Sequence, residues 1–169
     1  MPTITKIADY KARYQIAKDA YSKKTLQTYI DTLEAKLIYE LLGAELGGLF
    51  LADLDTDGVP QTQRFIDIYN SFAIDDDCQL RCSGGIKEYL LGLIYFDYCR
   101  NDNTYNSQIG NKGAVSENSE IAGNLWNDLS QRYNISIETG KEIQWYCECY
   151  KSEDYTEFKG IKLEITHWI

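Results

Sequence analysis

Residues 86–99 read IKEYLLGLIYFDYC, one of the most apolar stretches of the chain and the one that decides its fold. On a helix, the apolar side chains of this stretch would cover nearly every face. One side carries Ile86, Leu90, Leu93 and Phe96, and another carries Leu91, Ile94 and Tyr98. A helix of this kind needs neighbours all round it, so residues 84–100 are predicted to form the centre of a helical bundle.

Two further long helices are predicted, one on each side of this stretch. Residues 22–42 carry apolar side chains at helical spacing, and Gly43 follows in the position of a left-handed helix cap. Residues 118–150 keep a helical period from end to end. The β-branched run YNISIET inside them would locally favour a strand, but the period continues on both sides and favours a helix.

The remaining segments complete a mainly α chain. Residues 4–16 show a weak helical pattern, AELGGLFLADL reads as a short helix or turn, and QTQRFIDIYNSF reads as a further helix. AIDDDCQLRCSGG is expected to lead into the central helix, with its aspartates favouring the positive end of that helix. We therefore predict a bundle of four or five helices over residues 1–154, followed by an extended segment over 155–169.

The C-terminal segment alternates apolar and polar residues from Ile161 onward, which is typical of a strand. No second strong strand is evident to pair with it, and an isolated strand is not stable in water. We predict that it is an assembly contact outside the monomer's core, so that removing residues 157–169 leaves a folded helical protein. The alternative is that it covers a groove on its own bundle. The predicted contact residues are Tyr155, Phe158, Gly160, Ile161, Leu163, Ile165 and Trp168.

A long polar loop is predicted over residues 103–119, where almost every side chain is polar or small. Ordering a residue's backbone costs roughly 1–2 kcal/mol, and this loop has little apolar surface with which to offset that cost. We expect it to be poorly ordered in the isolated protein and ordered by contacts in an assembly.

The overall composition excludes several classes of function. The chain has 169 residues and a net charge of −9, and no basic run is present, so binding to nucleic acid through a basic surface is not expected. The N-terminus lacks the apolar region of a signal peptide, and no run approaches the ~20 apolar residues that span a bilayer. We expect a protein made and kept in a cytoplasm. The 14 tyrosines suit surfaces that become interfaces.

Candidate metal and catalytic motifs are incomplete. DLDTDG at 53–58 resembles the start of a calcium loop, but Arg64 occupies the twelfth position, where a carboxylate must close the site, so we interpret the motif as a turn. Cys147 and Cys149 on a helix would point about 200° apart. His167 is the single histidine, and no phosphate-binding glycine loop is present. We predict no catalytic site, no metal and no cofactor.

The order of the segments resembles a known family. YIDTLEAKLIYELLGAEL is followed by SGGIKEYLLGLIYFDYCRN, by a polar loop ending GAVSENSE, by a long helix and by YTEFKGIKLEI. This succession resembles the small head–tail connector (neck or adaptor) proteins of tailed bacteriophages, particularly those of Bacteroidetes phages, including crAss-like ring proteins. The likeness covers most of the chain. QIGNKG differs from the G-V-V-x-K run expected at that place, so the resemblance does not extend to this part of the loop.

The resemblance implies a non-enzymatic helical protein of the virion, assembled in the bacterial host cytoplasm. Such proteins form a ring, usually a dodecamer, between the portal protein and the tail or further neck proteins. The genome passes through the ring without specific binding, and no membrane is involved. In this picture the C-terminal strand pairs with the portal or an adjacent subunit. The loop residues expected to meet neighbours or the channel are Asn111, Lys112, Val115, Glu117 and Asn118.

Two other functions remain open from the sequence. One is a small cytoplasmic helical scaffolding or regulatory protein that is not part of a virion. The other is a metal-dependent nuclease that uses Asp75, Asp76 and Asp77, which would require a bound metal.

Overall fold

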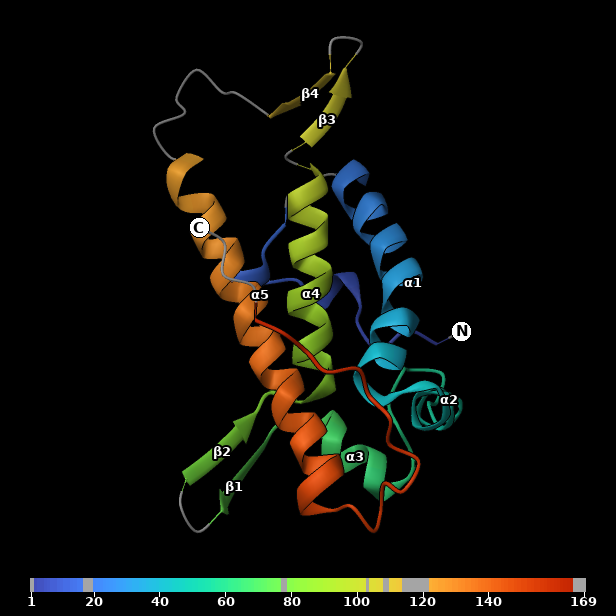
Figure 1. The fold of residues 1–169 in the computed structure, drawn as a ribbon. Coiled ribbons are helices and arrows are strands. Elements are labelled where there is room, and N and C mark those ends of the chain that lie inside the picture. Colours follow the sequence, from blue (N-terminus) through green and yellow to red (C-terminus); the bar gives the residue numbers. More distant parts are fainter. Residues whose placement is uncertain are drawn as a thin grey trace.

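The computed structural model describes residues 2–16, 20–76, 79–102, 104–107, 110–113 and 122–165. Its architecture is mainly α, as predicted, and three long helices run side by side (Figure 1). These are α1 (Ala20–Leu42), α4 (Gly85–Asp102) and α5 (Ala122–Trp145), and they confirm the three longest predicted helices. The shorter elements are η1 (Ile7–Asp9), η2 (Ala12–Tyr14), α2 (Ala44–Ala52), α3 (Gln63–Tyr69), β1 (Phe72–Asp76), β2 (Gln79–Ser83), β3 (Thr104–Ser107), β4 (Gly110–Gly113) and the π-helical turn η4 (Tyr146–Tyr150).

Helix α4 lies between α1 and α5, as its all-round apolar pattern predicted (Figure 1). Every residue from 89 to 96 is buried. Gly92 permits a close approach of α5, because a Cβ at this position would lie 1.7 Å from Oγ of Ser136. The central helix therefore combines large apolar side chains with one position where only glycine fits.

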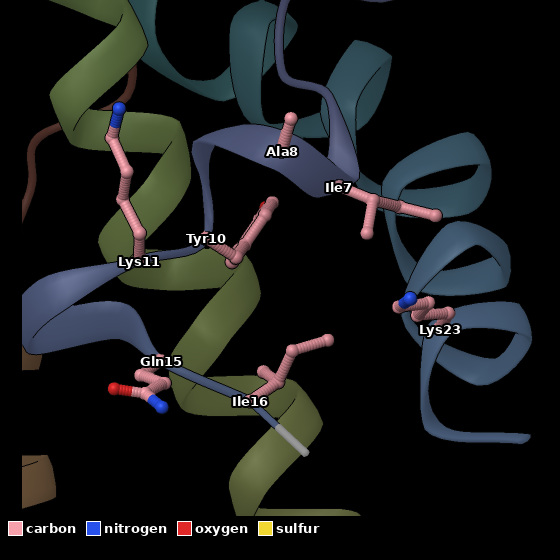
Figure 2. A pocket seen from close by; sticks show the side chains of 7 residues that line it. All are labelled: Ile7, Ala8, Tyr10, Lys11, Gln15, Ile16 and Lys23. Atoms are coloured by element: carbon pink, nitrogen blue, oxygen red, sulfur yellow. The ribbon is translucent and has the colours of Figure 1, made fainter. Parts of the chain in front are cut away.

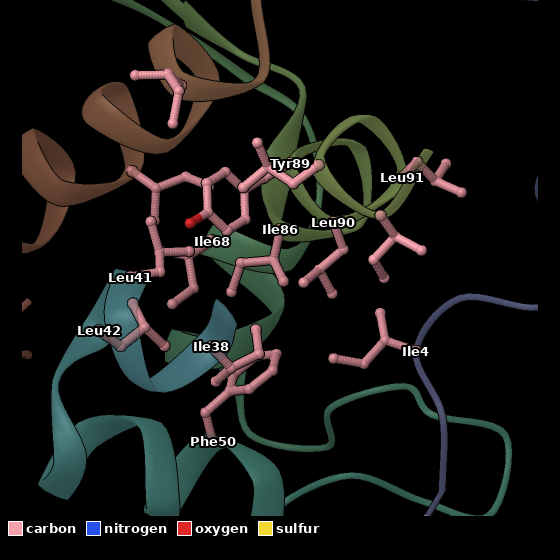
Figure 3. Packing of buried hydrophobic residues seen from close by; sticks show 14 of the residues in the cluster. Ile4, Ile38, Leu41, Leu42, Phe50, Ile68, Ile86, Tyr89, Leu90 and Leu91 are labelled. Atoms are coloured by element: carbon pink, nitrogen blue, oxygen red, sulfur yellow. The ribbon is translucent and has the colours of Figure 1, made fainter. Parts of the chain in front are cut away.

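The core joins the long helices to the short ones at one end of the bundle. Figure 3 shows Ile38 of α1, Phe50 of α2 and Leu90 of α4 packing together with Ile4 of the N-terminal segment. Phe50 meets Phe65 of α3 edge to face, with ring centroids 5.5 Å apart. This contact fixes α2 and α3 against the same core.

The N-terminal segment does not form the predicted helix. Residues 2–16 run extended across the bundle with only the two 3-10 turns η1 and η2. The carboxylate of Glu34 in α1 accepts hydrogen bonds from the backbone N–H of Ile4 at 2.9 Å and of Thr5 at 2.8 Å, and from the Thr5 hydroxyl at 2.9 Å. Tertiary contacts thus replace the local hydrogen bonds of a helix.

Residues 72–76 and 79–83 pair as an antiparallel hairpin, β1–β2, instead of forming the predicted lead-in to α4. Asp75 and Asp76 lie in β1, so the prediction that they favour the start of α4 is wrong; Asp77 lies outside the described residues. A two-stranded hairpin is marginal alone, and packing on α5 supplies the missing stability. The side chain of Arg81 lies over the Trp145 ring, 4.3 Å from its centroid, and its guanidinium lies 3.0 Å from the Glu142 carboxylate.

The segment DLDTDG forms a turn, as predicted. Oδ1 of Asp55 accepts hydrogen bonds from the backbone N–H groups of Asp57 and Val59, and Gly58 has a φ of 79°. The carboxylate of Asp53 accepts the N–H groups of Gln61 and Thr62 at the start of α3. These aspartates therefore serve the turn and the helix that follows it.

Part of the predicted polar loop has regular backbone structure. Strands β3 and β4 pair antiparallel beyond the end of α4 that is opposite to β1–β2 (Figure 1). The prediction about order in the rest of residues 103–119 lies outside the described residues.

Candidate assembly interface

The C-terminal segment lies on its own bundle. It begins at Tyr155, which is only 2% exposed and whose hydroxyl donates a hydrogen bond to the carbonyl oxygen of Arg64. Its ring meets that of Tyr146 at a centroid distance of 5.9 Å. From there the segment crosses in front of α4 towards α5 (Figure 1). Burial raises the pKa of Tyr155, in keeping with a side chain held inside the core.

The segment also satisfies the end of α1, where a helix leaves its last carbonyls without partners. The N–H of Lys159 donates to the Leu42 carbonyl at 3.2 Å, and the N–H of Ile161 donates to the Glu40 carbonyl at 2.8 Å. Nε2 of Gln144 donates to the carbonyls of Leu41 at 2.9 Å and Ile161 at 2.8 Å. The strand-like segment therefore finds its hydrogen bonds at a helix end rather than at another strand.

Gly160 permits this close approach. A Cβ at this position would lie 2.1 Å from the Leu41 carbonyl oxygen and 2.8 Å from Nε2 of Gln144. Glycine is required because the backbones of the segment and of α1 come too close for any side chain. A glycine at this position allows either a turn or the close approach of another backbone. The structure shows a close approach, and the approaching backbone belongs to the same chain.

The prediction that the segment stays outside the monomer's core is wrong. Tyr155 belongs to the core, and Phe158, Leu163 and Ile165 pack against it. The alternative, in which the segment covers a groove on its own bundle, describes the observed packing. Trp168 lies outside the described residues.

Ile161 differs from its neighbours because its side chain is 61% exposed. It borders a mainly apolar hollow of about 560 Å³ where α1 meets α2. We call this surface the α1–α2 shelf. Its residues are Ala35, Lys36, Tyr39, Glu40, Gly43, Ala44, Lys159 and Ile161.

The hairpin β1–β2 has one face on the bundle and one in solvent. On the bundle side, the ring of Phe72 lies 4.9 Å from that of Tyr146, and Oγ of Ser83 donates to the Thr139 carbonyl at 3.0 Å. Successive residues of a strand point to opposite faces, and directly paired residues share a face. The exposed residues Ala73, Asp75, Leu80 and Cys82 therefore form one surface, which we call the hairpin outer face.

The hairpin outer face was not predicted from the sequence. Leu80, the most apolar residue on it, is 68% exposed. The signal that would have found it is an acidic turn between two short alternating runs, FAID and QLRC, which is a hairpin pattern.

The predicted loop contacts are described only in part. Asn111 and Lys112 lie in β4, where they pair with Asn106 and Tyr105. The other three predicted loop contacts, Val115, Glu117 and Asn118, lie outside the described residues.

A hollow of about 620 Å³ lies between the N-terminal segment and α1. Figure 2 shows Ile7 and Ile16 from the segment and Lys23 from α1 facing this space. The described residues that line it include no carboxylate, histidine or cysteine. They therefore offer no carboxylate or imidazole base and no thiol nucleophile.

The described residues contain no group of three or more His, Cys, Asp or Glu placed to hold a metal ion. Cys147 is buried and Cys149 is exposed, so their thiols do not face one site. Burial raises the pKa of the Cys147 thiol, which keeps it protonated and unreactive. His167 and Cys78 lie outside the described residues.

Within the described part of the chain, no helix has both the length and the apolar character needed to cross a membrane.

Comparison of the chain with protein-family models, curated proteins and solved structures found no match.

Proposed function

We propose that this protein is a structural subunit of the neck of a tailed bacteriophage, forming a ring between portal and tail through which the genome passes. The proposal starts from the resemblance of the segment order to head–tail connector proteins. A mainly α bundle with the predicted long helices is the type of fold that this resemblance implies.

The observation that carries the proposal is the uneven exposure of the C-terminal segment. Tyr155, Phe158 and Leu163 face the subunit's own bundle, whereas Ile161 turns outward beside Tyr39, which is 41% exposed. A segment needed only to cover its bundle gains nothing from an exposed isoleucine. A subunit that meets neighbours around a ring gains an apolar contact at every interface.

The charge of the chain supports the same function. A net charge of −9 disfavours binding of the DNA backbone, so a genome passing through a ring of such subunits would not be held by it. The ring would take its strength from contacts between proteins, which the tyrosine-rich composition suits.

The direct test begins with the neighbouring genes, which should include one for a portal protein. Co-expression of this chain with that portal protein, followed by purification of the portal ring and electron microscopy, tests whether the two bind. We expect copies of this chain in an added ring on the tail-facing side of the portal. Mass spectrometry of purified virions should detect the chain in amounts equal to the portal subunit.

Absence of the chain from virions, together with no binding to the portal ring, would contradict the proposal. That result would favour the alternative, a small cytoplasmic helical scaffolding or regulatory protein that is not part of a virion. Binding to a capsid precursor with loss before maturation would also reject a place in the neck.

A further inference from the structure

We propose that the hairpin outer face of one copy of this chain docks on the α1–α2 shelf of the next copy. The inference deepens the proposed function, because it names the two surfaces that would join neighbours within the ring. Its chemistry is an apolar contact between Leu80 and the shelf, accompanied by an ion pair between Asp75 and Lys159.

The two surfaces are placed for a repeating contact. Figure 1 shows β1–β2 projecting on one side of the lower half of the bundle, with α2 and the end of α1 on the other side. A contact between two different surfaces on opposite sides of a subunit continues from copy to copy and closes into a ring when the rotation allows.

Their shapes and apolar groups are complementary. The hairpin is a projection that carries Leu80, which is 68% exposed, and the shelf is a hollow of about 560 Å³. The apolar side chains available to receive Leu80 are those of Ala35, Tyr39, Ala44 and Ile161. Single exposed apolar residues are common on protein surfaces, so Leu80 alone does not mark an interface; the match between the two surfaces does.

Their charges are complementary as well. Asp75 pairs directly with Leu80 in the hairpin register and therefore lies on the same face. Among the described residues, neither Asp75 nor Lys159 has an ion-pair partner, whereas Lys36 of the shelf lies 3.6 Å from Glu40. Asp76, on the other face of the hairpin, lies 3.6 Å from Arg81. The uncompensated charges are thus negative on the hairpin and positive on the shelf.

The same charges disfavour symmetric pairing. Two shelves facing each other would bring one Lys159 towards the other, and two hairpins would bring together two copies of Asp75. Like charges placed opposite each other are unfavourable. The contact is therefore between unlike surfaces, as a ring requires.

A complementation experiment tests the pairing of unlike surfaces. Leu80→Asp removes the hairpin contact, Ile161→Asp removes the shelf contact, and Ile135→Asp is a matched control on α5, where Ile135 is 41% exposed outside both surfaces. We expect each of the first two to weaken self-association at least about tenfold in sedimentation at high protein concentration, because each places a charge where an apolar side chain would be buried. Ile135→Asp should behave like the unaltered protein.

Mixing the two weakened variants should restore one contact. The Ile161→Asp chain keeps its hairpin and the Leu80→Asp chain keeps its shelf, so the mixture should form dimers and no larger species. Absence of dimers in the mixture would overturn the proposal.

A cross-linking experiment extends the test to weak association. Cys82 lies on the hairpin outer face, so Ile161→Cys places a second thiol across the proposed contact. Mild oxidation at about millimolar concentration should yield a ladder of dimers and higher species on a non-reducing gel. The added change Cys82→Ser or Leu80→Asp should abolish the ladder. Dimers that persist with Cys82→Ser indicate that two shelves meet through the thiols introduced at position 161, and a ladder that persists indicates linkage through another thiol, such as the exposed Cys149. Either result, or the absence of any cross-linked species, overturns the proposal.

Failure of the inference is distinct from failure of the proposed function. Protein that joins the portal ring but gives no ladder through Cys82 is a neck protein whose neighbours meet elsewhere. Protein that gives the ladder but never joins the portal self-associates as inferred without being a connector.

Discussion

Two extended segments, residues 2–16 and 155–165, cross the same bundle and are held by different chemistry. Both bond to α1. The N-terminal segment bonds to the buried carboxylate of Glu34, which is 6% exposed, in the interior of that helix. The C-terminal segment bonds to the free carbonyls at the helix end and to the neutral amide of Gln144.

In segments without secondary structure, the hydrogen-bonding groups of the backbone can find partners in a charged side chain or in neutral groups. The choice decides whether the stability of the segment depends on pH. A buried carboxylate ties the N-terminal segment to a titratable group, and burial raises the pKa of Glu34 even though hydrogen bonds from Thr5 and Ile4 oppose the shift. The backbone hydrogen bonds of the C-terminal segment have neutral partners, and its titratable contact is a side-chain ion pair, in which Arg64 lies 3.3 Å from Glu157. This segment also turns Ile161 outward, whereas Ile4, Tyr10 and Tyr14 of the N-terminal segment are buried.

The largest effect should follow removal of the C-terminal segment after Thr156. Loss of Phe158, Leu163 and Ile165 from the edge of the core should lower the free energy of unfolding by about 3–5 kcal/mol. Urea denaturation followed by circular dichroism measures it. If the shortened chain unfolds at the same urea concentration as the full one, the segment does not stabilise the bundle. That result would support the sequence-based prediction that the bundle folds without residues 157–169.

Glu34→Ala should release the N-terminal segment from α1. It leaves two backbone N–H groups and the Thr5 hydroxyl without their acceptor, so we expect a loss of about 3 kcal/mol. Glu138→Ala, at an exposed position of α5, is the control and should change stability by less than about 0.5 kcal/mol. Equal losses for both variants would show that Glu34 does not hold the segment.

Gly160→Ala should disturb the packing of the C-terminal segment on α1 by adding a single methyl group. The new Cβ would lie 2.1 Å from the Leu41 carbonyl oxygen, and the forced displacement should cost about 1–3 kcal/mol. Gly48→Ala in α2 is the matched control, because nothing lies within 4 Å of its added Cβ. That control should stabilise by roughly 0.5–1 kcal/mol, since alanine favours a helix. Thermal unfolding of the two variants gives the comparison directly.

The two segments should also differ in how their contribution to the free energy of unfolding depends on pH. Because the native pKa of Glu34 is raised, the native state holds the proton more tightly than the unfolded chain. The protonated Glu34 carboxyl therefore stabilises the native state. This contribution is fully present below the pKa of Glu34 in the unfolded chain, about 4.3, and is lost as the pH rises through its pKa in the native state. The stability difference between the unaltered protein and Glu34→Gln should therefore shrink with rising pH, as measured by urea denaturation. The difference for Gly160→Ala should stay flat over the same range.

The smallest effect is expected at Ile161. Ile161→Ser should change monomer stability by less than about 0.5 kcal/mol, because the side chain is 61% exposed. Leu163→Ser, two residues on and packed against the core, should cost about 1–2 kcal/mol in the same urea titration. A large loss for Ile161→Ser would mean that this residue serves its own bundle and would remove the main support for the proposed contact.

Elements with strong local patterns were predicted correctly from the sequence. The long helices α1, α4 and α5 follow from apolar periodicity, and the turn at 53–58 follows from its aspartates and glycine. The hairpin β1–β2 was missed because its five-residue strands carry weak patterns and depend on α5 for stability. The N-terminal segment was mistaken for a weak helix because the acceptor of its N–H groups, Glu34, lies 30 residues away in the chain.

The candidate interface was predicted in part. Gly160 and Ile161 were identified from the alternation and the glycine in the tail, whereas Tyr39, Lys159 and Leu80 were not. Tyr39 and Lys159 come together only through the packing of α1, α2 and the segment, and only the hairpin register places Leu80 on the outer face. No sequence spacing brings Tyr39 beside Ile161.

Apolar periodicity predicts a mainly α bundle with α4 at its centre, and the glycine at position 160 indicates either a turn or a close backbone approach. These features depend on helical period and on the size of side chains, which act locally. Only the tertiary structure decided that the approaching backbone was the end of α1, and that Leu163 turned inward while Ile161 turned outward. The physical reason is that alternation assigns residues to two faces of a segment, but the partner that approaches each face is set by packing between parts of the chain far apart in sequence.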